Sequence, residues 1–258
     1  MRRIVLIATA LGVLIAAGAA YAAINTYSAT LKFTSKKPGT AAKPVATGFT
    51  QDIKAAGTSG NRTAVLLDIK TTIYGLKVDG KDFPTCTSAQ IVAAGADTGC
   101  PKGAEVATGY ITASIGSKSN FAASGTPCDP LLDVWNSGQG KLTFFFVDTP
   151  THQCVAGAIT TGKVGPYPAT YKNVGKNLVV DVPIPTYVDF PLPGVAGSLE
   201  TEHLVWKAST TKVKGKTVAS IASVACSGSK RPYSQSFKAN LPTTNSTKSK
   251  TVSGSAAC

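Results

Sequence analysis

Hydrophobic and polar residues alternate with a period of two along much of this chain. Successive side chains of a strand point to opposite faces, so this alternation is typical of antiparallel strands with one face inward and one toward water. It predicts roughly eleven or twelve strands. The clearest stretches are 27–33, 65–73, 178–184 and 233–238, and further strands are expected at 45–52, 104–115, 131–136, 198–210 and 216–225.

Two segments depart from the alternation. Residues 142–147 (LTFFFV) are apolar on both faces, which predicts a central strand between two layers. Residues 88–94 (SAQIVAA) predict the one helix, with Thr87 as its N-cap and Gly95 at its end. The sequence therefore predicts an all-β fold, an antiparallel β-sandwich (one large or two stacked) with a short helix near 88–94.

Proline and glycine cluster at 161–170 and at 183–197, which are the candidate domain boundaries. Neither segment is polar enough to be a free linker. We therefore expect a single β-sandwich unit over 23–258, with a sub-division near 161–170 left open. The chain of 258 residues is long enough for either arrangement.

The first 22 residues have the features of a signal peptide. Two arginines precede an uncharged apolar run over 4–20, and Ala20-Tyr21-Ala22 is the small-x-small pattern that signal peptidase recognises. We expect cleavage after Ala22 and a secreted protein, extracellular or on the cell surface. An uncleaved membrane anchor is the alternative, since the run is just long enough to span a bilayer. No later apolar run reaches that length, so the mature chain is expected to have no transmembrane segment.

Six cysteines in an exported chain predict disulfide bonds, because thiols oxidise outside the cytosol. Their connectivity is not fixed by sequence, but the spacing favours three local couples: Cys86 with Cys100, Cys128 with Cys154, and Cys226 with Cys258. A metal site is the alternative, with His152 near Cys154, but there is no C-x-x-C pair. A free Cys258 that joins two chains is a second alternative. We expect no metal and no cofactor.

The charge of the chain is +13, from 26 Lys and Arg against 13 Asp and Glu, and no acidic residue follows Glu202. Such a surface attracts polyanions. The expected partners are anionic cell-wall polymers or polysaccharides; no nucleic-acid-binding motif is present. The alternative is that these side chains only keep the β surface soluble. The residues expected to face a polyanion are Lys207, Lys212, Lys214, Lys216, Lys230, Arg231 and Lys238, of which the three at 212, 214 and 216 share a side if that segment is extended.

The sequence offers little for catalysis. It holds two histidines and no G-x-S-x-G pattern, so a nucleophile triad is not expected. The best enzyme-like pair is Glu200 and Glu202, which a regular strand would place on one face about 6.5–7 Å apart. That separation suits a glycosidase, although solvated strand faces commonly carry such pairs. Trp206 has the same parity as Glu202 and would accompany a sugar-binding face.

Several short motifs are shared with a loose family of exported, disulfide-containing β-rich proteins of actinobacteria that have no assigned activity. The chain resembles this family over most of its mature length. The resemblance implies export, disulfide bonds and a closing pair formed by Cys226 and Cys258; it implies no ligand and no catalytic residue. The shared motifs are Lys37-Pro38-Gly39-Thr40 with Pro44, Phe83-Pro84-Thr85-Cys86, Cys100-Pro101-Lys102-Gly103 and Val106-Ala107-Thr108-Gly109.

Taken together, these patterns predict a secreted, non-enzymatic β-sandwich protein at the bacterial cell envelope, structural or ligand-binding, with a basic C-terminal surface. The alternative is a secreted carbohydrate-active enzyme that uses Glu200 and Glu202. The sequence does not indicate the oligomeric state.

Overall fold

The computed structural model describes residues 24–35, 37–154 and 164–258. The expected signal peptide and residues 161–163 of the candidate boundary lie outside the described residues. Twelve of the described strands form one sheet, in which every hydrogen-bonded pair is antiparallel. Eleven of them follow each other in the order β1 (Asn25–Phe33), β3 (Phe49–Gly57), β12 (Val195–Trp206), β6 (Glu105–Ser117), β8 (Leu131–Asn136), β9 (Lys141–Val147), β10 (Tyr167–Val174), β11 (Asn177–Pro183), β4 (Val65–Tyr74), β16 (Lys230–Leu241) and β17 (Ser246–Ala257); β7 (Thr126–Cys128) pairs with β6.

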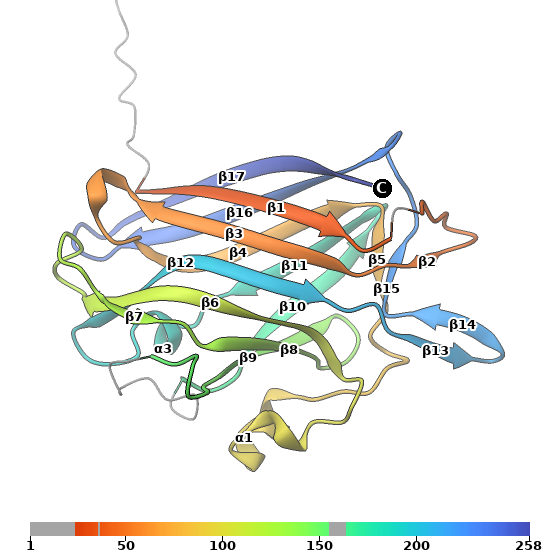
Figure 1. Cartoon of the computed structure of the whole chain (residues 1–258), viewed down its shortest axis with the longest axis horizontal. Coiled ribbons are helices and arrows are strands. Elements are labelled where there is room, and N and C mark those ends of the chain that lie inside the picture. Colours follow the sequence, from red (N-terminus) through yellow and green to blue (C-terminus); the bar gives the residue numbers. More distant parts are fainter. Residues whose placement is uncertain (1–23, 36, 155–163) are drawn as a thin grey trace, which may run out of the picture.

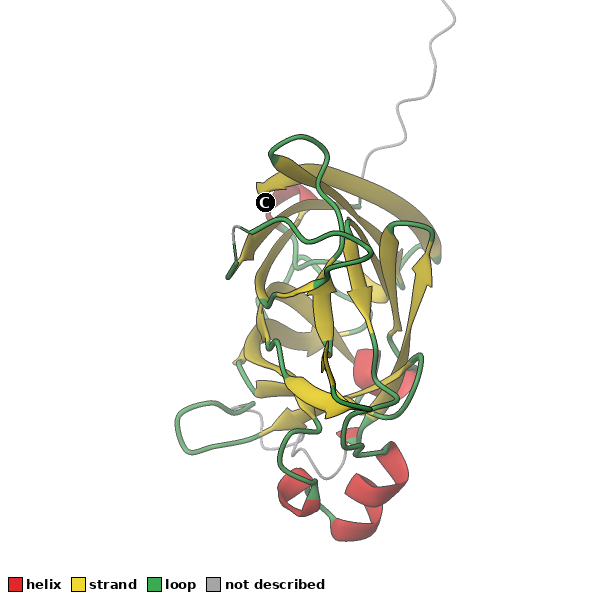
Figure 2. Ribbon diagram, turned by 90° about the vertical axis from the view of Figure 1, so that its right-hand side faces the viewer, coloured by secondary structure: helices red, strands yellow, loops and turns green. Residues whose placement is uncertain are grey.

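The sheet curls until its two edge strands, β1 and β17, lie side by side (Figures 1 and 2). Side chains hold this seam together. The ring of Tyr27 on β1 stacks on Phe237 of β16 with centroids 4.2 Å apart, and the Tyr233 hydroxyl donates to the Ala29 carbonyl oxygen over 3.1 Å. The antiparallel β prediction is confirmed. The sandwich is not confirmed, because one nearly closed, barrel-like sheet encloses the core.

Every second residue of the strands faces the interior and forms the main hydrophobic core. The largest fully buried members include Phe49, Ile53, Ile73, Leu132, Leu178, Leu204 and Phe237. The alternation of the sequence therefore marks the inner face of a curled sheet.

Helix α1 (Ser88–Ala94) forms where the sequence predicts it. The Thr87 hydroxyl accepts from the Gln90 backbone N–H, while the Gln90 side chain accepts from the Thr87 backbone, so the first turn has a capping box. Gly95 ends the helix with φ 70°, a left-handed conformation that favours glycine.

Strand β9 is buried on both faces, as predicted. Leu142 and Phe144 belong to the main core. On the outer face, Phe145 packs with Trp135 and with Ile91 of α1. The second layer over β9 is therefore a helix rather than another sheet, which is why the LTFFFV pattern is compatible with a single curled sheet.

The three disulfides join the pairs that the spacing favours: Cys86 with Cys100, Cys128 with Cys154, and Cys226 with Cys258. No cysteine is free, so Cys154 is not available as a metal ligand and Cys258 does not need a second chain. The Cys226–Cys258 bond fastens the end of β17 to the segment before β16.

The remaining elements lie outside the main sheet. A small sheet forms from β2 (Val45–Ala46), β15 (Ile221–Ser223) and β5 (Leu76–Val78), and a hairpin forms from β13 (Thr210–Val213) and β14 (Lys216–Ala219). The short helix α3 (Thr186–Asp189) precedes β12, and 3-10 turns span Thr58–Gly60 and Asp97–Gly99. None of the helices in the described ranges is long and apolar enough to cross a membrane.

The seam predicts a large penalty for shortening Phe237. Phe237→Ala removes a fully buried ring that also joins β16 to β1, and it is expected to lower the free energy of unfolding by about 3–5 kcal/mol. Val174→Ala, at a side chain that is 49% exposed, is the control and is expected to change it by less than about 0.5 kcal/mol. Urea unfolding with the disulfides intact measures both. Similar losses in the two variants would contradict a seam held by Phe237.

Candidate ligand-binding cavity

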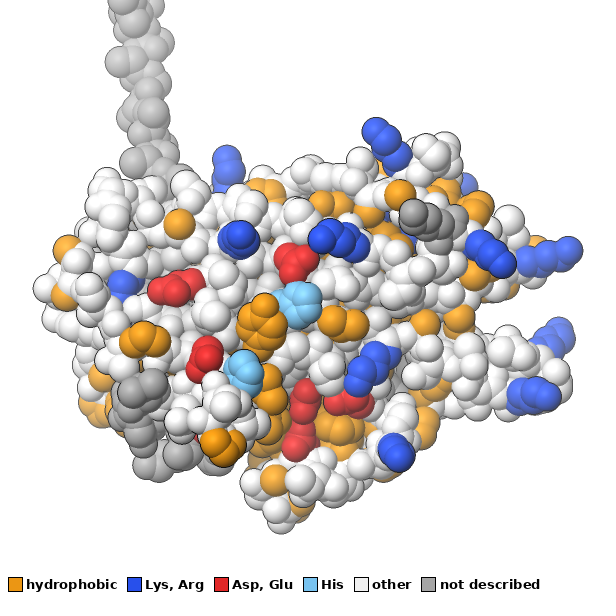
Figure 3. All heavy atoms as spheres, in the orientation of Figure 1, with side chains coloured by type: hydrophobic (Ala, Val, Ile, Leu, Met, Phe, Trp, Pro, Cys, Tyr) orange, Lys and Arg blue, Asp and Glu red, His pale blue; other side chains and the backbone are white. Residues whose placement is uncertain are grey.

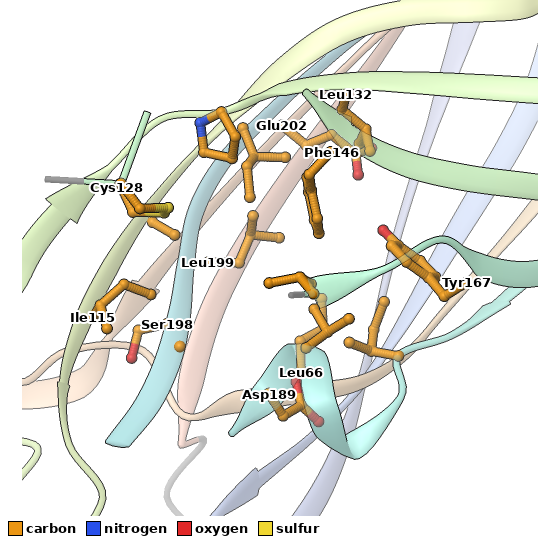
Figure 4. Close-up of a pocket in the computed structure, with 18 of the residues that line it drawn as sticks. Leu66, Ile115, Cys128, Leu132, Phe146, Tyr167, Asp189, Ser198, Leu199 and Glu202 are labelled. Atoms are coloured by element: carbon orange, nitrogen blue, oxygen red, sulfur yellow. A yellow bond between two sulfur atoms is a disulfide. The ribbon is translucent and has the colours of Figure 1, made fainter. Parts of the chain in front are cut away.

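An apolar cavity lies inside the sheet beside α3 (Figure 4). It encloses about 100 Å³. For scale, an apolar cavity of about 150 Å³ is large enough to bind benzene. Strands β4, β6, β8, β9, β10 and β12 contribute its walls, whose main apolar side chains are Leu66, Ile69, Ile111, Ile115, Leu132 and Phe146.

One extra residue in β12 shapes this cavity. Leu199 pairs with Ala113 and Glu202 pairs with Ile111, so partners that are two residues apart on β6 are three apart on β12. Such an insertion is a β-bulge, and it shifts the phase of the side chains beyond it. Because Ala113 and Ile111 share the inner face of β6, the bulge at Glu200 brings both Leu199 and Glu202 into the interior.

Glu202 is a buried carboxyl group in this cavity, 7% exposed. Its Oε1 accepts a hydrogen bond from Gln51 Nε2 over 2.6 Å. Burial disfavours the charged form and raises the pKa of Glu202 to about 7, although the Gln51 hydrogen bond acts in the opposite direction. Glu202 therefore gains or loses its proton near neutral pH.

Asp189, the last residue of α3, is a second buried carboxyl group and is 5% exposed. No described residue gives its side chain a hydrogen bond or an ion pair. Burial raises the pKa of Asp189 to about 8. Tyr167 stands nearby, and its pKa is raised by burial first and then by the charges of Glu202 and Asp189, with Tyr187 contributing. The cavity thus combines apolar walls with two acids that are easily neutralised.

The expected pairing of Glu200 with Glu202 is wrong. Glu200 is the bulged residue; it is exposed and borders a hollow on the outside of the sheet together with Arg62 and Thr63. Glu202 lies inside. Strand β12 is not regular at this point, so the two carboxylates do not flank a common site. Trp206 does share the inner face with Glu202, but it is buried in the core.

The predicted basic surface is not brought together as one patch. Arg231 is fully buried: its guanidinium lies over the Phe33 ring, 4.2 Å from the centroid, and donates to Ser223 Oγ over 2.6 Å. Arg231 is therefore removed from the predicted set, because the core encloses it. Lys207 forms an ion pair with Glu105, which offsets its charge. Lys230 and Lys238 are exposed at separate positions on β16.

Three of the predicted lysines do share one element, the β13–β14 hairpin, and all three are exposed. They do not share one side, as an extended segment would require. Lys214 and Gly215 form the turn with φ 48° and 79°, and Lys212 pairs with Thr217 whereas Lys216 pairs with Val213, so Lys212 and Lys216 face opposite ways. Figure 3 shows basic side chains at the tip of this projecting hairpin.

Both histidines lie on the outer face of the sheet, beside Tyr110 (Figure 3). His203 Nδ1 is 2.7 Å from Asp52 Oδ1, and its ring centroid is 5.2 Å from that of Tyr110. His152 stands beyond Tyr110, with ring centroids 6.4 Å apart, and its Nδ1 is 3.6 Å from Asp129 Oδ2. Neither histidine lines the cavity. Among the described residues, no cluster of three or more His, Cys, Asp or Glu has a geometry that would hold a metal ion.

Asp189 and Tyr167 are not among the site residues that the sequence predicts. One signal was present: Asp189 is the only charged residue in the otherwise apolar and proline-rich segment 182–193. A lone acid in such a segment indicates either a turn or a buried group, and the one-turn helix α3 is what buries it.

Comparisons with protein-family models, with characterised proteins and with solved structures found no match. The function proposed for this chain therefore rests on its own residues.

The buried acids predict that stability falls as pH rises. A carboxyl group whose pKa is raised on folding binds a proton more tightly in the folded state, so its stabilising proton is present at low pH and is lost as pH rises from about 4 toward 8. We expect the free energy of unfolding to fall as the pH rises from 5 to 8.5. In the Asp189→Asn/Glu202→Gln double variant this fall is expected to be smaller, by on the order of a few kcal/mol.

Urea unfolding at pH 5, 7 and 8.5 measures this difference. Asp133 and Asp68, whose pKa values are raised to about 7 and about 6, give a residual slope of the same sign in both proteins, so the comparison isolates the cavity. Parallel pH profiles would contradict the assignment of Glu202 and Asp189 as the acids responsible.

Proposed function

We propose that this chain is a secreted, non-enzymatic binding protein of the bacterial cell envelope that holds a small apolar ligand inside its curled sheet. The observation that carries the proposal is the apolar cavity of about 100 Å³ with two buried carboxyl groups in its lining. Ligand sites are typically concave and apolar, with a few polar groups that fix orientation. Barrel-like sheets that enclose a ligand use the same interior space.

The arrangement of this interior favours a binding role over a purely structural one. Protein cores are normally close-packed and avoid carboxyl groups that lack partners, because both features reduce stability. Here a bulge places Glu202 on the cavity wall, and a one-turn helix places Asp189 there. A sheet with a purely structural role would be more stable with apolar residues at both positions.

Export is supported by two independent features. Three disulfides fasten the described fold, and disulfides persist mainly in oxidising compartments. The N-terminal 22 residues have the pattern of a signal peptide. The bacterial envelope as the place of action is proposed from the short motifs of the sequence alone. The alternative of a carbohydrate-active enzyme loses its main support, since Glu200 and Glu202 face different sides of the sheet.

A second activity, contact with an anionic polymer of the cell wall, is favoured by the β13–β14 hairpin. It carries Lys212, Lys214 and Lys216 and no acidic residue. The turn spreads the three ammonium groups around the tip, which suits a flexible polyanion that can wrap a small positive projection. Of the seven basic residues that the sequence predicts to face a polyanion, this proposal keeps the three lysines of the hairpin.

Filling the cavity is expected to abolish binding of small apolar ligands. Xenon and n-butanol are suitable probes, and Ala113→Leu adds bulk at a wall residue that is 7% exposed. In the unchanged protein, amide NMR shifts are expected to move at Ile111, Ala113 and Leu199. Val205→Leu, on an outward-facing side chain 37% exposed, is the matched control and should retain binding. The proposal fails if xenon and n-butanol leave these signals unmoved in the unchanged protein.

Removing the hairpin charges is expected to weaken retention on a polyanion. The Lys212→Gln/Lys214→Gln/Lys216→Gln variant should elute from heparin-agarose at a lower salt concentration than the unchanged protein. A control variant, Lys32→Gln/Lys54→Gln/Lys141→Gln, removes the same charge from exposed positions on the main sheet. Equal shifts in both variants would indicate that only net charge matters and would remove the hairpin as a distinct contact.

A further inference from the structure

The cavity is acidic within a basic protein. The chain carries a net charge of +13. Yet the described residues that line the cavity include Asp148, Asp189 and Glu202 and no lysine, arginine or histidine. Arg62 approaches from outside, where its Nη1 donates to Ser198 Oγ over 3.2 Å. The ionisable side chains of the described lining are therefore acids and tyrosine, whereas the molecule as a whole is basic.

The two most buried acids lack a cationic partner among the described residues. Asp189 has no hydrogen bond or ion pair for its side chain, although it is about nineteen-twentieths buried. Glu202 receives one hydrogen bond on Oε1 from the neutral Gln51 side chain. Figure 4 shows Glu202 on β12 and Asp189 on α3 at different ends of the apolar lining, with Leu199 between them. A bound molecule would thus meet carboxyl groups at its ends and hydrocarbon along its body.

We propose that the cavity selects a small alkylammonium ion, a primary amine with a short apolar body, whose nitrogen is held by the carboxylate at one end of the cavity, that of Asp189 or that of Glu202. This inference rests on the proposed function, because it names the class of ligand that the same cavity takes. An ammonium group donates up to three hydrogen bonds and accepts none, so it matches acceptors that are ionised and unpaired. The short alkyl chain replaces water against Leu66, Leu199 and Phe146.

Proton release accompanies this binding. Among the described residues, the other titratable groups that line the cavity are Tyr167 from β10 and Asp148 after β9, with Tyr187 of α3 near Tyr167, and none of these carries a positive charge. Burial holds the pKa values of Glu202 and Asp189 at about 7 and about 8, so the ammonium ion competes with protons below that range. Amine binding should weaken as pH falls, whereas an aliphatic ammonium ion itself stays charged throughout, as a lysine side chain does.

Three probes of similar shape separate the possibilities: n-butylamine, n-butanol and butyrate. NMR titration of the mature chain at pH 8.5 is expected to give an amine affinity at least about tenfold higher than that of the alcohol, the size of one charge-assisted hydrogen bond. Butyrate should bind most weakly, since like charges repel. At pH 5.5 the preference for the amine over the alcohol is expected to disappear.

Isosteric variants locate the preference. Asp189→Asn and Glu202→Gln should each reduce the ratio of amine to alcohol affinity at pH 8.5, and the double variant should remove it while n-butanol still binds. Asp133→Asn is the matched control, because Asp133 is also an acid with a raised pKa but lines an outer hollow with Asp97 and Glu105. It should leave the ratio unchanged.

The outcomes also separate this inference from the proposed function. If n-butanol and n-butylamine bind equally, or if the double variant keeps the preference, the amine inference is overturned and apolar binding stands. If neither probe moves the signals of the cavity, the proposed function itself fails. If the amine shifts only the NMR signals near Asp133, it binds through surface charge, and the inference is overturned.

Discussion

The bulge at Glu200 shifts the phase of β12 by one residue, and the chemistry of the interior depends on that shift. In a regular strand, the face that holds Leu199 would continue through Thr201, His203 and Val205. The insertion instead turns Glu202, Leu204 and Trp206 inward, against β3 and β6. Two large apolar side chains then complete the core, which stabilises the bulge. One carboxyl group is carried inside with them.

Curling of the sheet gives this inward carboxyl group its unusual environment. On an open antiparallel sheet, one face is commonly solvated, and a glutamate there keeps an ordinary pKa. Here β1 meets β16 and β17 through Tyr27, Phe237 and Tyr233, so the inner face is closed off from water. The same closure surrounds Asp189 when α3 packs on the interior. Closure of the sheet therefore accounts both for the packing at the seam and for the raised proton affinity of the carboxyl groups in the cavity.

Local signals in the sequence predicted the local structure well. Strand alternation, the Thr87 and Gly95 ends of α1 and the cysteine couples all depend on neighbouring residues, and they appear as expected. The choice between a sandwich and a curled sheet depends on what the inner face meets, which alternation does not encode. The two-sided β9 pattern was compatible with both, because a helix covers Phe145 as effectively as a second sheet.

The two wrong predictions about which side chains share a face have the same cause. Glu200 with Glu202, and Lys212 with Lys216, were paired by counting positions along a regular strand, and a bulge and a turn respectively interrupt those strands. The phase change in β12 was visible in the sequence, since Leu199 is at an odd position whereas Leu204 and Trp206 are at even ones. The hairpin turn was less visible, because a lysine adopts the left-handed conformation at its first central position.

The interior holds two kinds of buried ionisable group: one keeps its charge, and the other can lose it by taking a proton. Arg231 is enclosed, and burial lowers its pKa, yet an arginine remains protonated in proteins, so its charge stays in place against the Phe33 ring and Ser223 Oγ, although Nε and Nη1 have no hydrogen-bond partner among the described residues. Glu202 and Asp189 can instead become neutral by taking a proton. The charge of the cavity is therefore set by pH and by whatever cation enters, whereas the charge beneath Phe33 is fixed. Selectivity for a cationic ligand follows from this difference, because only the acids have a state that a ligand can stabilise.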